Sequence, residues 1–528
     1  MLLGRVKPLD AILATAERKS LHRSLGAVQL TLLGIGSVIG TGIFVLTASG
    51  AQKAGPGLML AFIIAGLVCI VAALCYAEIA SMIPVAGSAY TYTYASMGEL
   101  LAWTVGWALI MEYAIAASAV SVGWSGYFTG TILNQFLGIH LPPWLAAGPL
   151  ALGGAEGGLI NLPAMLIALL VTTLLVIGTS ESAKFNAVLV AIKLVALTVF
   201  VALTYTSPEF SSDKLNPFLP AGLFGGFGTG LGAVGAAATM FFAYVGFDSV
   251  STAAEETVNP QRNVPIGLVG SLLICTVFYI LVAAGAVGTL GGQPIMGAAG
   301  VPFEPGSAEL ARQCAMPEHS EALVCSKEAL AHVLRVIGFS GIGNLLGIAA
   351  FLALPSVILV LLYGQTRIFF VMSRDGLLPE KLSTVHPRFK TPHIMTMITG
   401  GVVALGAAFF PVGGLADISN AGTLYAFSFV AIALLVLRKT DAARSRHFRV
   451  PAAWLIAPLT ILGCVFLFFN LPKQAMLFLP EWGVLGLVIY FLYSRRHSHL
   501  GQGRVEVHET EIGEIEPDIP GVADRGRP

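Results

Sequence analysis

The sequence predicts an all-α integral membrane protein with twelve transmembrane helices. Of its 528 residues, 56% are hydrophobic and only 11% are charged, whereas about a quarter of the residues in a soluble domain carry a charge. Long apolar runs alternate with polar breaks along the chain, and about 20 apolar residues are enough for a helix to cross a bilayer. Basic residues also gather in alternate connecting segments, which is typical of a multi-pass protein.

Reading the apolar runs in order gives the twelve expected spans, each bounded by polar or proline-containing breaks. They lie at about 26–51, 57–82, 99–130, 160–179, 183–206, 228–252, 265–290, 336–372, 393–411, 416–437, 451–471 and 479–494. Residues 1–25 are basic and polar and lack the apolar core of a signal peptide, so we expect a cytoplasmic N-terminal segment. The polar residues 495–528 are expected to form a disordered cytoplasmic tail.

The basic residues predict the orientation. With the N-terminus inside the cell, six of them fall on the outer side: Lys53, Lys214, Arg312, Lys327, Arg335 and Lys473. The other 23 of the 29 lie on the cytoplasmic side or within spans. Because basic residues are retained in cytoplasmic loops, we expect both termini in the cytoplasm and the protein in the inner (plasma) membrane.

Charge, motifs and cysteines exclude several classes of function. The formal net charge is zero, which gives nucleic-acid binding no electrostatic support. The sequence contains no Walker, HExxH or GxSxG motif, so no ATP site, enzymatic centre, cofactor or metal is expected. Cys314 and Cys325 share the longest outer loop, where a disulfide can persist. Two free thiols are the alternative.

The first span opens with GIGSVIGTGIF, residues 34–44. Each glycine there costs a helix about 1 kcal/mol relative to alanine. The spacing does not fit the GxGxxG dinucleotide motif, and no strand precedes it. Two interpretations stay open. Gly36 and Gly40 form a GxxxG packing motif, or the helix is broken so that its backbone lines a cavity and holds a zwitterion.

A second break is expected in span six, where Phe241 to Glu256 read FFAYVGFDSVSTAAEE. Gly246 and the charged Asp248 interrupt this apolar run. Spans one and six lie five apart, as a five-plus-five inverted repeat with broken helices 1 and 6 requires. We therefore expect a transport core at 26–437, with repeats at about 26–206 and 228–437, followed by two accessory transmembrane helices at 438–494.

Five stretches, in this order and spacing, resemble the amino acid–polyamine–organocation (APC) superfamily, and most of all the bacterial branch of the cationic amino acid transporter family. They are GIGSVIGTGIFVLTASGAQKAGPG, CYAEIASMIPVAGSAYTYTYASMGE, SAKFNAVLVAIKL, FFAYVGFDSVSTAAEETVNPQRNVPIG and LLYGQTRIFFVMSRDGLLP. The resemblance covers about residues 26 to 395. It implies the inverted-repeat fold with two peripheral helices and a transporter of L-amino acids that is not an enzyme.

The resemblance also implies where the substrate binds. Thr41 and Gly42, in the flexible segment that starts at Gly40, would hold the α-carboxylate. The ammonium would meet the carbonyl groups of Ile39, Phe242, Ala243 and Val245. Phe242 and Tyr244 would wall the pocket, with core packing as the alternative for both rings.

Four further polar residues lie inside expected spans. Lys193 lies about ten residues, or about 15 Å, into span five. Burying an ammonium inside a membrane costs several kcal/mol, so we expect such a residue to have a function. The resemblance implies that Lys193 replaces the sodium ion of related transporters and couples transport to protons; snorkelling to the surface is the alternative. The resemblance also implies an ion-site region with paired hydroxyl residues in span eight; here Ser356 keeps one hydroxyl and Pro355, which is expected to kink the helix, replaces the other. Glu112 and Asp248 would pair with each other, relay protons, face the substrate or serve as structural hydrogen-bonding groups.

The sequence therefore predicts a proton-coupled importer of neutral or broad-range L-amino acids that works by alternating access. The alternatives are a cationic amino acid uniporter or exchanger and a transporter-like sensor. The short tail, about 34 residues without a predicted fold, argues against a sensor. We expect the amino acid, protons and the lipid bilayer as partners. No obligatory protein partner is expected, because residues 131–159 lack the cysteine of the heavy-chain-linked exchangers.

Overall fold

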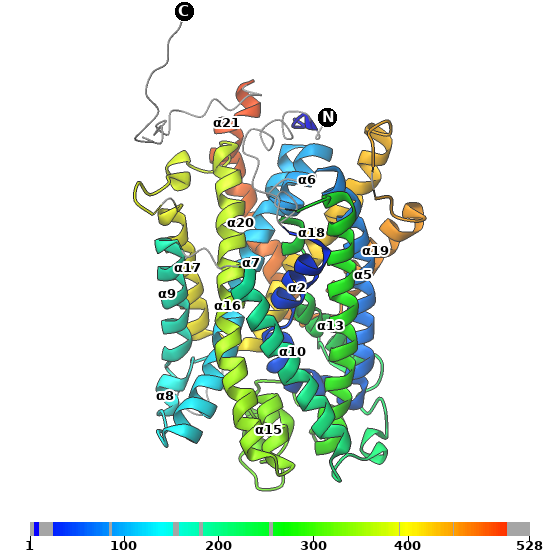
Figure 1. Ribbon diagram of the computed structural model, residues 1–528, viewed down its shortest axis with the longest axis vertical. Coiled ribbons are helices and arrows are strands. Elements are labelled where there is room, and N and C mark those ends of the chain that lie inside the picture. The colour runs from blue at the N-terminus through cyan, green and yellow to red at the C-terminus, as the bar shows by residue number, and fades with distance from the viewer. Residues whose placement is uncertain are drawn as a thin grey trace, which may run out of the picture.

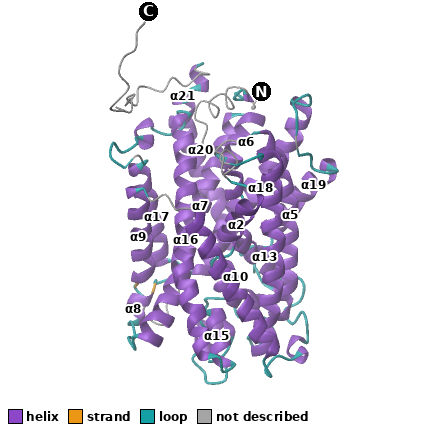
Figure 2. Ribbon diagram, in the orientation of Figure 1, coloured by secondary structure: helices purple, strands orange, loops and turns teal. Residues whose placement is uncertain are grey.

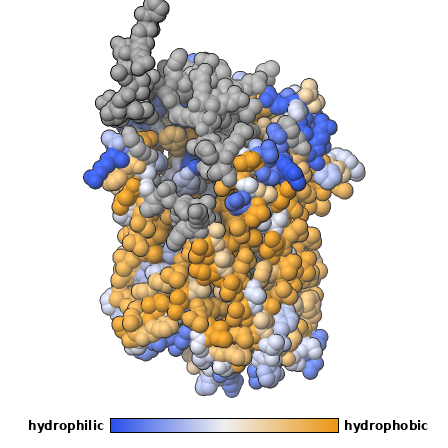
Figure 3. Space-filling view, viewed as in Figure 1, coloured by the Kyte–Doolittle hydropathy of each residue, from blue (hydrophilic) through white to orange (hydrophobic). Residues whose placement is uncertain are grey.

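The computed structural model describes residues 5–9, 25–83, 87–150, 158–178, 183–252, 257–389, 391–446 and 448–503. Figure 2 shows that the described chain is almost entirely helical, and its one named strand is β1 (Ile160–Asn161). The long helices run between two ends of the molecule, and α21 (Arg495–His497) lies at the upper end in Figure 1. A broad apolar belt separates polar ends on the face drawn in Figure 3. The predicted all-α membrane class is confirmed.

The helices follow the predicted order. In the first half of the chain they are α2 (Ala27–Val38), α3 (Thr41–Phe44), α4 (Leu46–Ala54), α5 (Leu58–Met82), α6 (Ser88–Ser96), α7 (Glu99–Tyr127), α8 (Pro143–Ala146), α9 (Leu162–Ile177) and α10 (Ala183–Thr206). In the second half they are α11 (Gly232–Met240), α12 (Ser249–Thr252), α13 (Pro260–Leu290), α14 (Ala308–Cys314), α15 (Ala329–Val336), α16 (Ser340–Arg374), α17 (His393–Phe409), α18 (Val412–Thr440), α19 (Ala453–Phe468), α20 (Lys473–Ile489) and α21 (Arg495–His497).

Seven helical segments of the described chain are long and apolar enough to cross a membrane, and shorter apolar helices accompany them. The shorter ones are α2, α9, α17, α19 and the segment Gly232–Tyr244. Two of these, α2 and Gly232–Tyr244, are short because their helices are interrupted. The number of twelve crossings remains a prediction.

Both predicted breaks are present. After α2, Ile39 is extended (φ −72°, ψ 98°) and Gly40 leaves helical geometry before α3 begins at Thr41. After α11, the short 3₁₀ helix η4 (Phe241–Tyr244) ends at an extended Val245 (ψ 137°). Gly246 then has φ +106°, a conformation that glycine adopts at little cost. Helical hydrogen bonding is therefore interrupted in both segments.

Helix α7 forms the centre of the bundle and packs against α16, α18, α17 and α9. Helices α9 and α17 lie side by side at one edge (Figure 1). The first broken helix, α2, packs against α13 and α10. Close approach depends on small residues: a Cβ atom at Gly34 of α2 would lie 2.5 Å from Ser271 Oγ of α13. This packing brings the two breaks together.

Two regions differ from the sequence-based expectation. Residues 495–503, expected in the disordered tail, form α21 and a 3₁₀ turn at Leu500–Gln502. They are held by polar contacts: Ser498 donates to the Glu99 carboxylate, and the N–H of His499 donates to the Asp375 carbonyl at 3.1 Å. Lys53, expected in an outer connection, is a buried residue of α4. The remaining tail, 504–528, lies outside the described residues, as does most of the N-terminal segment 1–25.

Candidate functional site

The two broken segments touch each other. A Cβ atom at Gly42 would lie 2.3 Å from the Cα atom of Ala243, so only glycine fits there. The Tyr279 hydroxyl of α13 lies 2.9 Å from the Val38 carbonyl oxygen and 2.8 Å from that of Ala243. The Ser37 hydroxyl donates to the Gly246 carbonyl at 2.9 Å. Side chains thus join the end of α2 to the interrupted segment after α11.

The first break offers free hydrogen-bond donors. Among the described residues, the backbone N–H groups of Gly40, Thr41 and Gly42 have no acceptor, as expected where a helix restarts. The Thr41 side chain is 1% exposed, and its hydroxyl has no hydrogen-bond partner. Buried polar groups are nearly always hydrogen-bonded. This set of donors therefore suits an anionic group such as a carboxylate.

The carbonyl groups around the breaks offer acceptors. Those of Ile39 and Val245 accept no hydrogen bond from the described residues. The Phe242 carbonyl accepts from the N–H of Val245 at 3.2 Å, and that of Ala243 accepts from Tyr279. Because a carbonyl oxygen has two lone pairs, these two can still accept one more bond. The two breaks thus place free donors and open acceptors on segments that touch each other.

The two predicted aromatic residues have different surroundings. Phe242 is buried beside the break, with 5% of its surface exposed. The Tyr244 hydroxyl donates to the Phe62 carbonyl of α5 at 2.9 Å, and its ring packs on that of Tyr279 with centroids 5.3 Å apart. The Tyr244 hydroxyl is therefore engaged by α5, which matches the core-packing alternative.

Lys193 reaches the first break from α10. Its ammonium donates to the Gly36 carbonyl at 2.7 Å, and the residue is 1% exposed. The side chain therefore does not snorkel to the surface. The other predicted ion-site residue, Ser356, donates to the Ala353 carbonyl of its own helix at 2.8 Å. Its neighbour Val357 packs against the backbone at Gly40.

The predicted intramembrane carboxylates lie between α7 and the second break. Asp248 accepts a hydrogen bond from the Tyr113 hydroxyl at 2.7 Å. Glu112, the preceding residue on α7, is 2% exposed, and its Oε2 atom has no hydrogen-bond partner. Glu112 therefore supplies an open buried acceptor, while Asp248 is anchored to α7.

Comparison with known proteins identifies this arrangement. The model of the amino acid permease family matches residues 25–483. The chain belongs to the amino acid permease family. The predicted membership of the APC superfamily is confirmed, and with it the prediction of a transporter rather than an enzyme.

Three relatives illustrate the range of the family. This permease is 46% identical over 495 residues to the branched-chain amino acid permease BcaP of Bacillus subtilis, covering 93% of this chain and 97% of the relative. It is 40% identical over 503 residues to the methylthioribose transporter of the same organism, covering 95% and 99%. It is 34% identical over 452 residues to the chloroplastic cationic amino acid transporter 9 of Arabidopsis thaliana, covering 84% and 72%.

One buried polar cluster of the permease was missed by sequence reasoning. The Lys53 ammonium lies 2.5 Å from the Thr239 hydroxyl and 3.3 Å from an Asp417 carboxylate oxygen. Thr239 donates to the other oxygen of Asp417 at 2.6 Å. The cluster joins α18 to α4, which follows the first break, and to α11, which precedes the second. The sequence feature that could have revealed this cluster is Asp417, a carboxylate near the start of the expected span 416–437.

Proposed function

We propose that this permease is a secondary active importer of neutral L-amino acids that works by alternating access and is driven by protons. The observation that carries the proposal is the set of free donors at Gly40, Thr41 and Gly42 opposite the open carbonyls of Ile39 and Val245. The donors match the carboxylate of a free amino acid, and the carbonyl groups match its ammonium. An amine has no carboxylate for the donors, and in a peptide the ammonium and the carboxylate lie on different residues.

The relatives support neutral, branched-chain substrates. BcaP of Bacillus subtilis and BcaP of Lactococcus lactis are both branched-chain amino acid permeases, at 46% and 31% identity. A cationic substrate needs a carboxylate for its side chain, and Asp248 is already held by Tyr113. Glu112 alone is left for that task, so a cationic amino acid uniporter or exchanger is the weaker proposal.

Lys193 is proposed as the proton-coupling group. Its hydrogen bond to the Gly36 carbonyl ties α10 to α2 three residues before the first break. A buried ammonium is stable only while it is paired, and a neutral amine is a weaker donor than an ammonium. Loss of the proton would therefore loosen the contact with α2 and allow the broken helix to move.

A second candidate substrate is methylthioribose, which the relative at 40% identity transports. This sugar has no α-carboxylate and would leave the donors at Thr41 without a charged partner.

We also propose that the permease lies in the plasma membrane with both termini in the cytoplasm, and that its core is a five-plus-five inverted repeat. A sensor would share the binding site but would not accumulate its ligand.

The test is uptake into proteoliposomes. Labelled leucine, alanine, arginine and methylthioribose are supplied with and without an inward proton gradient, for the wild type and for Lys193→Ala. The matched control is Lys381→Ala, which removes an exposed lysine. We expect gradient-driven accumulation of leucine in the wild type and in the control. In Lys193→Ala we expect leucine exchange without gradient-driven accumulation.

Other results would contradict parts of the proposal. Leucine uptake that ignores the gradient in the wild type would make the protein a facilitator or exchanger. Accumulation of arginine or methylthioribose in preference to leucine would replace the substrate. Binding of leucine without any flux would favour a sensor.

A further inference from the structure

A surface groove runs along α13 from Gln261 to Leu273. It has a volume of about 760 Å³, and α13 lines it with Arg262, Ile266, Val269, Gly270 and Leu273. Leu74 of α5 and Phe448, from the segment between α18 and α19, form the opposite wall. Ile266 and Leu273 are 44% and 50% exposed, so this groove is open at the surface of the helical bundle.

The groove has the length of one bilayer leaflet. From Arg262 to Leu273 the helix rises about 16 Å at 1.5 Å per residue, and half of a hydrocarbon core is about 15 Å. Phe448 and Arg262 lie at the same end of the groove as Glu78 and Val450, which bond to each other at 2.7 Å. That end of the molecule carries α21 (Figure 1) and is the proposed cytoplasmic end.

The groove has one charged lining residue. Arg262 is exposed, and within the described part of the chain its guanidinium has no carboxylate or other hydrogen-bond partner. The remaining lining is apolar apart from Gln261. An arginine fork matches the oxygens of a phosphate, and basic residues at this level of a membrane attract anionic lipids.

We propose that this groove binds an anionic phospholipid of the cytoplasmic leaflet. The phosphate lies at Arg262, and one acyl chain follows the apolar track from Ile266 to Leu273. The charge selects an anionic headgroup, and the apolar length of one leaflet selects an acyl chain rather than a soluble anion. The inference concerns binding alone, so it does not depend on the proposed substrate or coupling ion.

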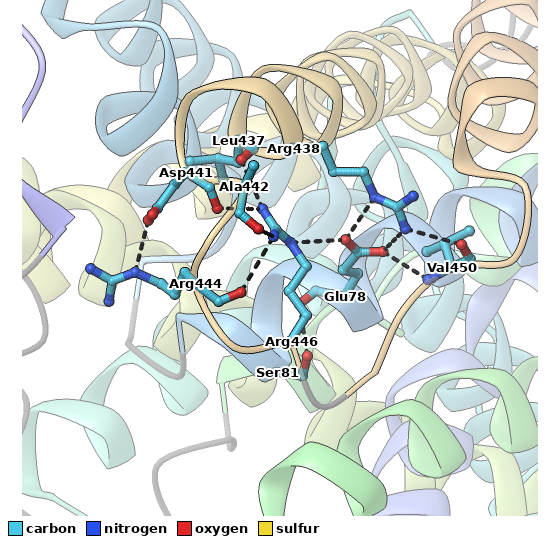
Figure 4. A network of polar contacts seen from close by, with 9 residues as sticks. All are labelled: Glu78, Ser81, Leu437, Arg438, Asp441, Ala442, Arg444, Arg446 and Val450. Carbon is cyan, nitrogen blue, oxygen red and sulfur yellow. Dashed lines mark hydrogen bonds and ion pairs between the residues drawn. The ribbon is translucent and has the colours of Figure 1, made fainter.

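The groove also contacts the helices that move in the proposed cycle. The lining residue Gly270 and the buried Gly267 beside it pack on α2: a Cβ atom at Gly270 would lie 3.6 Å from the Thr31 hydroxyl, and one at Gly267 would lie 2.8 Å from the Leu30 Cβ. Phe448 belongs to the segment whose Arg446 forms an ion pair with Glu78 at 3.3 Å (Figure 4). A bound lipid would therefore stiffen the contacts between α2, α13 and this segment.

The experiment measures lipid retention by the intact protein in detergent, using native mass spectrometry with phosphatidylglycerol and phosphatidylcholine of identical acyl chains. For the wild type we expect preferential retention of phosphatidylglycerol. Arg262→Gln should lower phosphatidylglycerol binding about fivefold and leave phosphatidylcholine unchanged. Leu273→Asn, which puts a polar group into the acyl track, should lower retention of both lipids. The matched control is Arg496→Gln, an exposed arginine of α21 outside the groove.

Three results would each contradict a different part of the lipid-binding proposal. Retention of phosphatidylglycerol by Arg262→Gln at the wild-type level would overturn the headgroup assignment. Unchanged retention in Leu273→Asn would overturn the acyl track. Equal losses in Arg262→Gln and Arg496→Gln would show that binding follows the net charge of this end of the molecule and that the groove is not a site.

Discussion

At the scale of single residues, Thr41 is the most informative side chain of the site. Its hydroxyl is buried and has no partner, although burying an unpaired hydroxyl costs about 1–3 kcal/mol. Space around it is tight, because a Cβ atom at Gly123 of α7 would lie 2.7 Å from the Thr41 methyl group. A bound carboxylate would both satisfy the hydroxyl and use the neighbouring N–H groups.

Replacing Thr41 tests this role. Thr41→Val keeps the shape and removes the donor, so we expect the KM for leucine to rise about 10- to 100-fold, as for loss of a hydrogen bond to a charged group. Thr41→Ser keeps the hydroxyl and should remain within a few-fold of the wild type. Equal kinetics of Thr41→Val and the wild type in proteoliposomes would remove Thr41 from the substrate site.

At the scale of the elements, α16 shows how the bundle accommodates a proline. Pro355 lacks the N–H that would bond to the carbonyl of Phe351, four residues earlier. The Trp124 indole of α7 donates to this carbonyl at 2.9 Å, and its ring stacks on Phe351 with centroids 5.2 Å apart. Helix α16 therefore continues from Ser340 to Arg374, and the proline links α16 to α7.

Trp124→Phe keeps a ring but removes the donor. We expect a loss of about 1–3 kcal/mol in unfolding free energy, because the Phe351 carbonyl is left unsatisfied. The control is Trp144→Phe, since Trp144 is 50% exposed and its loss should be nearly neutral. Thermal melts in detergent compare the two variants, and equal melting temperatures would show that another group satisfies the carbonyl.

The short helix α15, which precedes α16, should respond to pH through His332. Burial lowers the pKa of His332 from its ordinary value of 6.5, so the unfolded segment binds a proton more readily than the folded one. The stability that the neutral His332 ring contributes to the folded state is therefore fully present above about pH 6.5. It is lost as pH falls from there through the lowered pKa. The neighbouring Glu328 has a pKa raised by burial, which acts in the opposite direction.

Hydrogen exchange of α15 can separate the two groups. After correction for intrinsic exchange rates, protection of residues 329–336 is measured between pH 5 and pH 7 for the wild type and for His332→Gln. Glu328 is present in both proteins, so their difference isolates the histidine. We expect the wild type to lose more protection than the variant on acidification. Parallel curves would contradict a role for His332.

At the scale of the whole molecule, the proposed cytoplasmic end is held by ionic contacts between distant segments. Glu78 of α5 is fully buried and accepts two hydrogen bonds from Arg438 of α18, at 2.9 Å and 2.5 Å, and one from the N–H of Val450 (Figure 4). Nearby, Lys7 forms an ion pair with Asp375 at 2.7 Å. These contacts fix this end in one arrangement.

Glu78→Gln should therefore be strongly destabilising. Removing one partner leaves the Arg438 and Arg446 charges without their shared carboxylate, and breaking a buried ion pair costs about 3–5 kcal/mol. The control is Glu209→Gln, whose side chain is 62% exposed. We expect a clear drop in melting temperature for Glu78→Gln alone. A melting temperature like that of the control would show that solvent compensates the two arginines.

The sequence by itself determined what local composition encodes. Apolar runs fixed the membrane class and the order of the helices, and the glycines at 34–42 and 246 marked both breaks before any contact was known. Lys193 was recognisable because a charge in an apolar helix is rare. These signals are local, since each depends on residues within a few turns of one another.

Only the tertiary structure decided which distant groups meet. Tyr279 joins both breaks, Lys53 finds Asp417 across 364 positions, and Trp124 completes the hydrogen bonding that Pro355 interrupts. A tyrosine, tryptophan or lysine in sequence looks the same whether it packs in a core or bonds to a carbonyl. Its partner is selected by helix packing over hundreds of residues, and the bilayer removes water as a competing partner.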